Sequence, residues 1–367
     1  WLKLVSTATS AIDPGERPGA RMLCAMECCG SFGPPCHGCG KQIRKGREAT
    51  CRSAVGGCGK VFCSLCCSYA LVPASEESKG KDAEFSLYCK PCFKANNLLD
   101  FSTTVDVFGP ACGAAPCILF VHGMLNCRSS FRVHARQLSE RDGFRCVLLD
   151  LPGHGARMDE DLSIASALDA IESAVKTYCT DAGGMPTFIL GMSLGGFLAM
   201  EMLGRSPDLF AGAILVECNF NLGVGRSLKN KMRLWAMQKA FGCVAYMSNA
   251  QVLEYFWKAW KGGGHISTEI LMTALMRTGV FPRPVPACAT IAGCVDLLAG
   301  LRLFRGPVLF MQVSKGDEDI FVGATERGRL KYVEGGDHQY PVDDRFMQGF
   351  INDIASFVRE VAAQATP

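Results

Sequence analysis

One six-residue segment, GMSLGG at 191–196, limits the fold of this chain more than any other part of it. It follows the apolar run TFIL and begins a helical pattern, so Ser193 lies where a strand would turn directly into a helix. A serine at such a tip needs small neighbours, because side chains at the flanking positions would clash with the strand and with the following helix. Since GxSxG also occurs by chance, its interpretation depends on the surrounding chain.

From residue 98 onward, apolar runs of strand length alternate with longer helical segments. The runs occupy residues 117–123, 146–153, 187–191, 211–218, 307–313 and 330–336. The helical apolar spacing appears over residues 162–179, 194–204 and 344–364. This alternation predicts an α/β fold with a mostly parallel sheet covered by helices.

A proton-accepting group for Ser193 is sought after the last strand, where a side chain reaches over the top of the sheet. The chain has six histidines, and His338 in GGDHQYP is the one that follows the last predicted strand. An orienting carboxylate is expected after the penultimate strand, where VSKGDEDIF offers Asp317, Glu318 and Asp319. The chain order serine, acid, histidine is the order used by α/β-type serine enzymes.

Two backbone N–H groups are predicted to stabilise an oxyanion beside Ser193. Leu194 begins the helix after the turn, where N–H groups have no partner within the helix. The second donor is expected at Met124, because the preceding His122-Gly123 ends a strand at the carboxyl edge of the sheet.

The segments ILFVHGM, DLPGHG, GMSLGGF, GDED and GGDH occur in this order, and residues 98–367 resemble the α/β-hydrolase superfamily. The resemblance is nearest the branch of monoacylglycerol lipases, serine aminopeptidases and carboxylesterases. It implies Ser193 as nucleophile, His338 as general base and Asp319 as orienting acid. Asp319 is preferred because apolar residues follow it, whereas counting from the strand end favours Asp317. Of the two-strand hairpin that usually opens this fold, only FSTTVDVFG is recognisable.

Residues 220–305 resemble the helical cap that this superfamily inserts between two strands. The segment is rich in Phe, Trp and Met, which suits an apolar substrate channel and equally an ordinary helical core. These residues include Trp235, Met237, Phe241, Tyr255, Phe256, Trp257 and Trp260.

The 21 cysteines are distributed unevenly, with twelve of them between Cys24 and Cys92. Most of the remaining nine lie in apolar surroundings, where a free cysteine behaves as a small hydrophobic residue. Four pairs can be drawn within the first group, three of them with the two-residue spacing that aims two thiolates at one metal ion. The pairs are Cys36/Cys39, Cys51/Cys58, Cys63/Cys66 and Cys89/Cys92.

These eight cysteines predict two tetrahedral zinc sites in a module spanning residues 24–97. Disulfides are the alternative, because an even cysteine count in a short stretch is also typical of a secreted scaffold. Zinc is favoured, since a module this small with few large apolar residues cannot fold by core burial alone. With four cysteine ligands each, both ions would be structural, and no cofactor is expected for catalysis.

The segments CGKVFCSLCC and YCKPCF resemble a FYVE-type zinc finger over residues 33–95. The resemblance implies cross-braced ligation, in which pairs one and three hold one ion and pairs two and four hold the other. The basic stretch with two histidines that reads phosphatidylinositol 3-phosphate is absent here, where residues 47–51 are REATC. We therefore expect only a weak preference for this lipid. A local basic cluster remains at Lys41, Arg44, Lys45, Arg47 and Arg52.

Charge and hydropathy restrict the partners and the compartment. A net charge of +3 is too small to indicate nucleic-acid binding. No apolar run reaches the roughly 18 residues that span a bilayer. Cysteine usage favours a reducing, cytoplasmic compartment. Through the finger, we expect peripheral attachment to endosomal membranes or to a protein partner. Residues 1–23 lack a signal-peptide core and an initiating methionine, so we expect a disordered segment and Met22 as a candidate start.

The sequence thus predicts a serine hydrolase that cleaves an ester or thioester of an apolar, acyl-lipid substrate. Two alternatives remain. An aminopeptidase acting on small amides would be favoured by acidic residues in the cap. A zinc-finger adaptor with an inactive hydrolase scaffold is opposed by the complete set of Ser193, Asp319 and His338.

Overall fold

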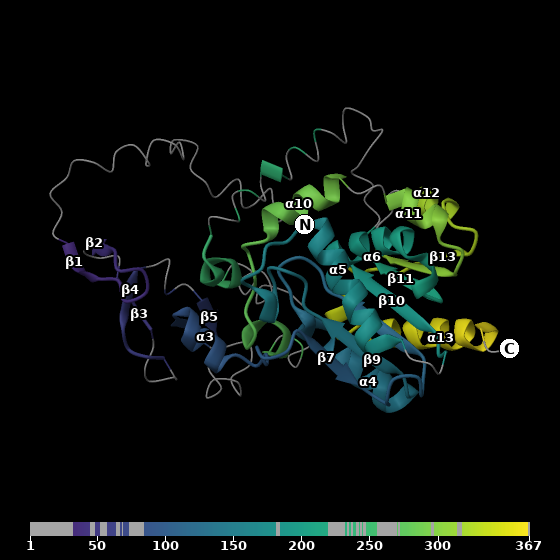
Figure 1. The fold of residues 1–367 in the computed structure, drawn as a ribbon, viewed down its shortest axis with the longest axis horizontal. Helices are drawn as coiled ribbons and strands as arrows, with labels where there is room; N and C mark the ends of the chain where they lie inside the picture. Colours follow the sequence, from purple (N-terminus) through teal and green to yellow (C-terminus); the bar gives the residue numbers. More distant parts are fainter. Residues whose placement is uncertain are drawn as a thin grey trace.

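The computed structural model describes most of the chain from residue 32 onward (Figure 1). The described residues are 32–44, 48–51, 57–63, 67, 69–72, 84–180, 184–218, 272–294, 297–313 and 318–365, together with 232, 235, 238, 239, 242, 244, 247–254 and 270. The segment 1–23, predicted to be disordered, lies outside them, as do residues 220–231 and 255–269 of the predicted cap.

A seven-stranded sheet forms the centre of the larger part of the molecule. From one edge to the other its strands are β13 (Gly328–Tyr332), β12 (Val308–Gln312), β11 (Gly212–Val216), β10 (Thr187–Met192), β8 (Cys117–Val121), β9 (Arg145–Leu149) and β7 (Val105–Phe108). All neighbouring pairs are parallel except β7 and β9, in which Val105 pairs with Leu149. The predicted parallel sheet is confirmed, and β7, from FSTTVDVFG, is its antiparallel edge.

Helices cover both faces of this sheet. The helices are α4 (Arg132–Asp142), α5 (Ile164–Ala174), α6 (Leu194–Arg205), α10 (Val285–Cys294), α11 (Leu297–Leu303), α12 (Glu318–Gly323) and α13 (Met347–Ala365). The central strands β8, β11 and β12 are almost continuously apolar because a parallel sheet covered on both faces buries the side chains of its inner strands. In β8 all five residues are buried.

The core has two halves, one on each face of the sheet. Leu119 and Val121 of β8 pack with residues of α5, α6, α10 and α11. Ile118 and Phe120 point to the other face and pack with residues of α4 and α13. This alternation follows from the two-residue period of a strand. Because α10 and α11 contribute Ile291 and Leu301 to the first half, the end of the predicted cap packs with the main core.

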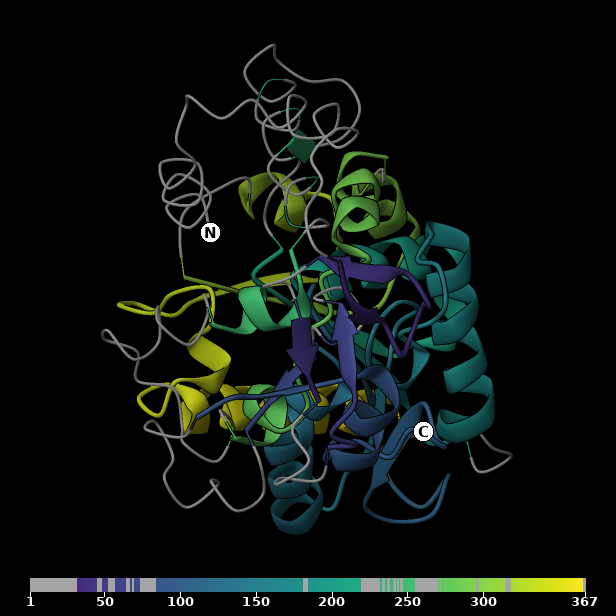
Figure 2. The ribbon, with the colours of Figure 1, turned by 90° about the vertical axis from the view of Figure 1, so that its left-hand side faces the viewer.

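The cysteine-rich module consists of three short antiparallel hairpins and one helix. The hairpins pair β1 (Phe32–Pro35) with β2 (Gln42–Arg44), β3 (Glu48–Thr50) with β4 (Val61–Cys63) and β5 (Tyr69–Leu71) with β6 (Ser86–Tyr88), and α3 spans Lys90–Asn96. In Figure 1 the module lies at one end of the molecule, with β5 and α3 nearest the sheet, and Figure 2 views the molecule from that end.

Residues 276–281, which we call the bridging segment, belong to the larger part and form hydrogen bonds with this module. Three consecutive carbonyls of the segment accept hydrogen bonds from the module and from Leu98, the residue that follows it. The Val72 N–H lies 2.8 Å from Met276 O, the Leu98 N–H lies 2.9 Å from Arg277 O, and the Asn97 side-chain amide lies 3.0 Å from Thr278 O. The module is therefore joined to the larger part along a continuous stretch of backbone.

Among the histidines that the structure describes in the larger part, His122, His134 and His154 are completely buried. Burial lowers the pKa of His122 and of His134 to about 4, and it lowers the pKa of His154 well below its usual value. These rings therefore stay neutral in the folded protein. His134 donates from Nε2 to Pro341 O at 2.7 Å and contacts Phe131 and Phe350 edge to face.

This arrangement predicts acid lability. A histidine with a lowered folded pKa stabilises the fold above its unfolded pKa of about 6.5, and this stabilisation is lost as the pH falls toward 4. Between pH 7.5 and 5.5, where most carboxylates remain ionised, each such histidine should remove roughly 1 kcal/mol from the free energy of unfolding. Denaturant titrations of wild type and His134→Gln at both pH values measure this. The variant should lose less stability over the interval, and an equal loss in both proteins would contradict the prediction.

Candidate active site and cysteine cluster

Ser193 lies in a sharp turn between β10 and α6 and has a strained backbone. Its φ is 53° and its ψ is −115°, a conformation that residues other than glycine rarely adopt. The turn is held by its neighbours, because the Ser193 N–H donates to Val216 O at 2.9 Å and the Phe197 N–H donates to Ser193 O at 3.1 Å. The predicted strand-to-helix turn is present, with Ser193 half-buried at its tip.

Close backbone approaches explain the glycines around Ser193. A Cβ placed on Gly195 would lie 2.1 Å from Val121 O, and one placed on Gly191 would lie 2.3 Å from Gly195 O. Backbone atoms cannot yield as a flexible side chain can, so these positions admit no side chain. The absence of a Cβ lets the first turn of α6 lie directly against the end of β8.

The end of β8 brings Gly123 and Met124 beside Ser193. A Cβ on Gly123 would lie 3.5 Å from the Cβ of Ser193, so the loop that starts there borders the serine. The next residue but one, Leu125, has a φ of 69°. Leu194 is the first residue of α6, and N–H groups in the first turn of a helix have no acceptor within it. Both predicted oxyanion donors therefore lie in backbone segments next to Ser193.

His122 supports this loop and is not a proton acceptor for Ser193. Its Nδ1 donates to Gly123 O at 2.7 Å, and its Nε2 accepts from the Leu151 N–H at 3.1 Å. His154 lies edge to face against it, with ring centroids 4.9 Å apart. Both ring nitrogens of His122 are thus used in holding the backbone.

His338 lies opposite a carboxylate that the sequence analysis did not identify. Its Nδ1 is 3.3 Å from Oε2 of Glu217. Glu217 directly follows β11, is only 3% exposed, and has a φ of 51°. Its other oxygen, Oε1, accepts from the Val313 N–H at 2.7 Å. A buried carboxylate with one oxygen fixed by the backbone and the other facing a histidine is arranged to orient that imidazole.

Glu217 and Ser193 are linked through neighbouring strands. The residue before Glu217 is Val216, whose carbonyl accepts the Ser193 N–H, and the Glu217 N–H donates to Met311 O at 3.0 Å. All these groups lie at the carboxyl ends of β10, β11 and β12, where a parallel α/β sheet places its sites.

The predicted acid falls in a region with no described side chains. Asp317 lies outside the described residues, and Asp319 lies in the first turn of α12, where its backbone is described but its side chain is not. The role of Asp319 as the orienting acid therefore stays a prediction. Glu217 was missed because it is the next-to-last residue of the run AGAILVEC, which was interpreted only as a strand. The signal in the sequence was a single charged residue at the carboxyl end of an otherwise apolar run.

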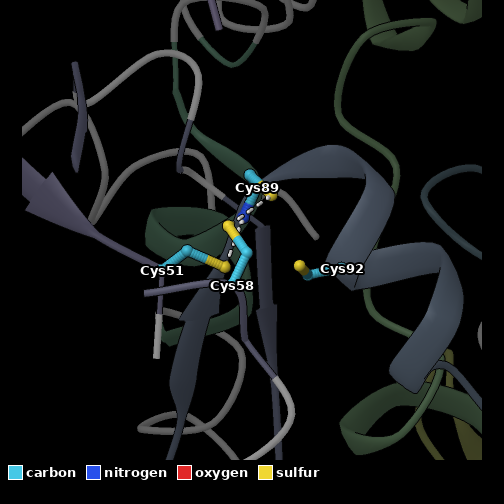
Figure 3. Close-up of side chains that lie close together, drawn as sticks. All are labelled: Cys51, Cys58, Cys89 and Cys92. Atoms are coloured by element: carbon cyan, nitrogen blue, oxygen red, sulfur yellow. Dashed lines mark hydrogen bonds between the residues drawn. The ribbon is translucent and has the colours of Figure 1, made fainter. Parts of the chain in front are cut away.

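Four cysteines of the module converge on one point. The sulfur atoms of Cys51, Cys58, Cys89 and Cys92 all lie within 4.8 Å of one another (Figure 3). Cys58 Sγ is 3.8 Å from Cys89 Sγ, and the Cys89 N–H donates to Cys51 Sγ at 3.4 Å. These four carry free thiols. The structure thus brings together the second and fourth predicted pairs.

The other predicted set is only partly described. Cys36 is buried and Cys39 exposed, whereas the side chains of Cys63 and Cys66 lie outside the described part. Cys67, which belongs to none of the four predicted pairs, is buried near the four converging cysteines. The pKa of Cys67 is raised to about 12, mainly because the side chain is buried and secondly because of the charges of the neighbouring cysteines. Cys67 therefore stays a neutral thiol at ordinary pH.

Two relatives overlap this chain over part of their length. The sn-1-specific diacylglycerol lipase ABHD11 of Mus musculus is 25% identical over 146 residues, which are 40% of this chain and 43% of that protein. The pimeloyl-[acyl-carrier protein] methyl ester esterase of Chromobacterium violaceum is 31% identical over 113 residues, 30% of this chain and 41% of that protein. The chain therefore spans less than half the length of each relative.

Solved structures share the fold over a larger part of the chain. MenH from S. aureus has a TM-score of 0.54 at 15% identity, covering 71% of this chain and 99% of that one. The esterase EaEST from Exiguobacterium antarcticum also has a TM-score of 0.54, at 16% identity, covering 70% of this chain and 94% of that one. Within the described residues, no helix is long and apolar enough to cross a membrane.

The alpha/beta hydrolase family matches residues 118–351, which contain β8 to β13, the turn at Ser193, and His338. Because this match covers more than half of the chain, the protein belongs to the alpha/beta hydrolase family.

Proposed function

We propose that this hydrolase is a serine enzyme that cleaves an ester or thioester of an apolar, acyl-lipid substrate. The contact between His338 and Glu217 at the sheet edge that carries Ser193 is the main support. A buried carboxylate facing an imidazole in this way is a familiar part of nucleophilic catalysis by serine.

In the proposed reaction, the Ser193 hydroxyl attacks the carbonyl carbon while His338 accepts its proton through Nε2. Nε2 is assigned this role because Nδ1 faces Glu217. The N–H groups of Met124 and Leu194 stabilise the negative charge that develops on the carbonyl oxygen. His338 then returns the proton to the leaving alcohol or thiol, which departs as the acyl-enzyme forms. Water, deprotonated by His338, releases the acid and restores Ser193.

Glu217 is proposed as the acid that positions His338, in place of Asp319. Its burial keeps the carboxylate away from water, and its bond to the Val313 N–H fixes it in one orientation. The negative charge stabilises the imidazolium that forms during attack without accepting the proton itself.

The proposed substrate class rests on the relatives. Two of them are named a diacylglycerol lipase and a methyl ester esterase, and both names describe ester cleavage. The seven aromatic and methionine residues named above for the predicted cap agree with an acyl chain. Of these seven, only the exposed Trp235 lies within the described residues.

The cysteine module is proposed to hold two structural zinc ions and to attach the enzyme to an endosomal membrane or a protein partner. Of the basic cluster that would meet an anionic membrane, only the exposed Lys41 has a described side chain. The FYVE-like resemblance and the attachment both stay predictions.

The proposed catalytic residues are tested by substitution. Ser193→Ala should abolish turnover and labelling by a fluorophosphonate. Glu217→Gln should lower kcat by up to roughly 10⁴ with little change in KM, because the imidazole loses its orienting charge while the binding surface is kept. Hydrolysis of a short-chain ester and labelling of folded protein measure both effects.

Two matched variants separate the alternatives for the acid. Glu334→Gln removes an exposed carboxylate near His338 in the sequence and should leave kcat unchanged. Asp319→Asn should retain most activity. Collapse of kcat in Asp319→Asn, with normal kcat in Glu217→Gln, would restore Asp319 as the acid.

The substrate class predicts a dependence on acyl length. With p-nitrophenyl esters of two to sixteen carbons, kcat/KM should rise with chain length, because each buried methylene contributes about 0.8 kcal/mol. Aminoacyl p-nitroanilides serve as the comparison. Faster cleavage of these amides than of every ester would instead identify an aminopeptidase.

Two zinc ions per chain are expected in purified protein. Elemental analysis of the full chain, with titration of thiols before and after chelation, measures this. A zinc content near zero, with the cysteines oxidised in pairs, would support disulfides instead.

A further inference from the structure

The four converging cysteines have the dimensions of a tetrahedral metal site. With zinc–sulfur bonds of about 2.3 Å, the ligand sulfurs of a tetrahedral site lie about 3.8 Å apart. The Cys58–Cys89 sulfur distance is 3.8 Å, and the Cys89 N–H to Cys51 Sγ bond supplies the outer hydrogen bond that often fixes a ligand. No position remains open for water, so an ion here would shape the protein and not react.

Two of these cysteines define the start of α3. Cys89 is the residue before the helix, and Cys92 lies in its first turn. A helix of seven residues is marginal by itself in water. Fixing Cys89 and Cys92 on one ion would hold the first turn of α3, and with it the direction of the side chain that follows.

That side chain is Phe93, which is completely buried against the bridging segment (276–281). Gly279 has a φ of +76°, and a Cβ placed on it would lie 3.0 Å from the Phe93 ring. The Tyr69 ring also packs against Phe93, with the two ring centroids 4.8 Å apart. Together with the three hydrogen bonds to Met276, Arg277 and Thr278, Phe93 fixes the bridging segment from the side of the module.

The other end of the bridging segment holds the loop beside Ser193. The Phe281 N–H donates to Leu125 O at 3.0 Å, and Leu125 follows Met124, the proposed oxyanion donor. The Phe281 ring contacts His154, which in turn contacts His122 at the start of the same loop. A continuous chain of contacts therefore runs from Cys89 to Met124.

Asn249 adds a second link between the module and this segment. Its side-chain oxygen accepts from the Ala70 N–H of β5 at 3.2 Å, and its side-chain nitrogen donates to Val280 O. Asn249 is 4% exposed. Carbonyls of the segment thus accept hydrogen bonds at residues 276, 277, 278 and 280, and Asn249 links the last of these to β5 of the module.

We propose that metal binding by Cys51, Cys58, Cys89 and Cys92 positions the oxyanion loop of the hydrolase, through α3 and the bridging segment. The cysteine module is then a structural part of the catalytic domain and not an independently tethered unit. The catalytic consequence rests on the proposed function, whereas the mechanical link from the cysteines to Leu125 does not.

The link is tested on the full chain by hydrogen exchange. Amide exchange of Leu98 and Phe281 is compared in zinc-loaded and chelated protein, with α13 as an internal reference for global unfolding. Both amides should exchange at least 10-fold faster after chelation while α13 keeps its protection. Reloading with Co²⁺ should restore protection together with the absorption of thiolate-bound cobalt. Unchanged exchange after confirmed loss of the metal would overturn the proposal.

Phe93→Leu tests the same link without touching a metal ligand. It should keep the zinc content of wild type, accelerate exchange at Phe281, and lower kcat by up to roughly 100-fold with little change in KM, since an oxyanion donor is displaced and not removed. Leu87→Ala, at an exposed apolar residue of the same module, is the matched control and should change none of these. If wild type shows faster amide exchange after chelation but no esterase activity, the proposed function alone is contradicted. If Phe93→Leu shows normal exchange at Phe281, the proposed link between the cysteines and the oxyanion loop alone is contradicted.

Discussion

The close approach of α6 to the end of β8 is the constraint on which the rest of the site depends. Because Gly191 and Gly195 carry no side chain, the helix starts against the carbonyls of β8, and Ser193 is forced into a conformation that L-residues rarely adopt. The strained conformation persists because the strand that leads into Ser193, β10, is held between β8 and β11 inside a buried sheet. The Val216 carbonyl that accepts the Ser193 N–H also sets the position of the next residue, Glu217, so the nucleophile and the proposed acid share one piece of backbone.

Burial and hydrogen bonding divide the histidines by role. His122, His134 and His154 are fully buried, their pKa values are lowered by burial, and their rings hold backbone segments. His338 is instead partly exposed and faces a carboxylate. A neutral buried imidazole is a good hydrogen-bonding support, whereas an imidazole that takes up a proton needs a compensating negative charge nearby.

The contacts of the bridging segment join the cysteine module to the hydrolase part of the chain. The small module, which carries few large apolar residues, is expected to fold around its metal ions and to attach the enzyme to a membrane or a protein partner. In addition, Phe93 and the donors at Val72, Asn97 and Leu98 lie against the backbone that leads to the loop beside Ser193. Hydrogen bonds to successive carbonyls leave little freedom between two segments, because each shift of the backbone would leave buried polar groups unpaired.

The sequence by itself determined the parallel sheet, the helices on its faces and the turn at Ser193, because apolar periodicity and the glycines around the serine are local properties of the chain. Cysteine spacing predicted the pairs Cys51/Cys58 and Cys89/Cys92, and the resemblance to a cross-braced finger implied that these two pairs converge. The sequence did not identify Glu217, since a carboxylate at the end of an apolar run becomes a partner of His338 only when strands distant in sequence lie side by side. The docking of α3 onto residues 276–281 was likewise decided by tertiary structure alone, because hydrogen bonds between segments almost 200 residues apart leave no periodic pattern in the sequence.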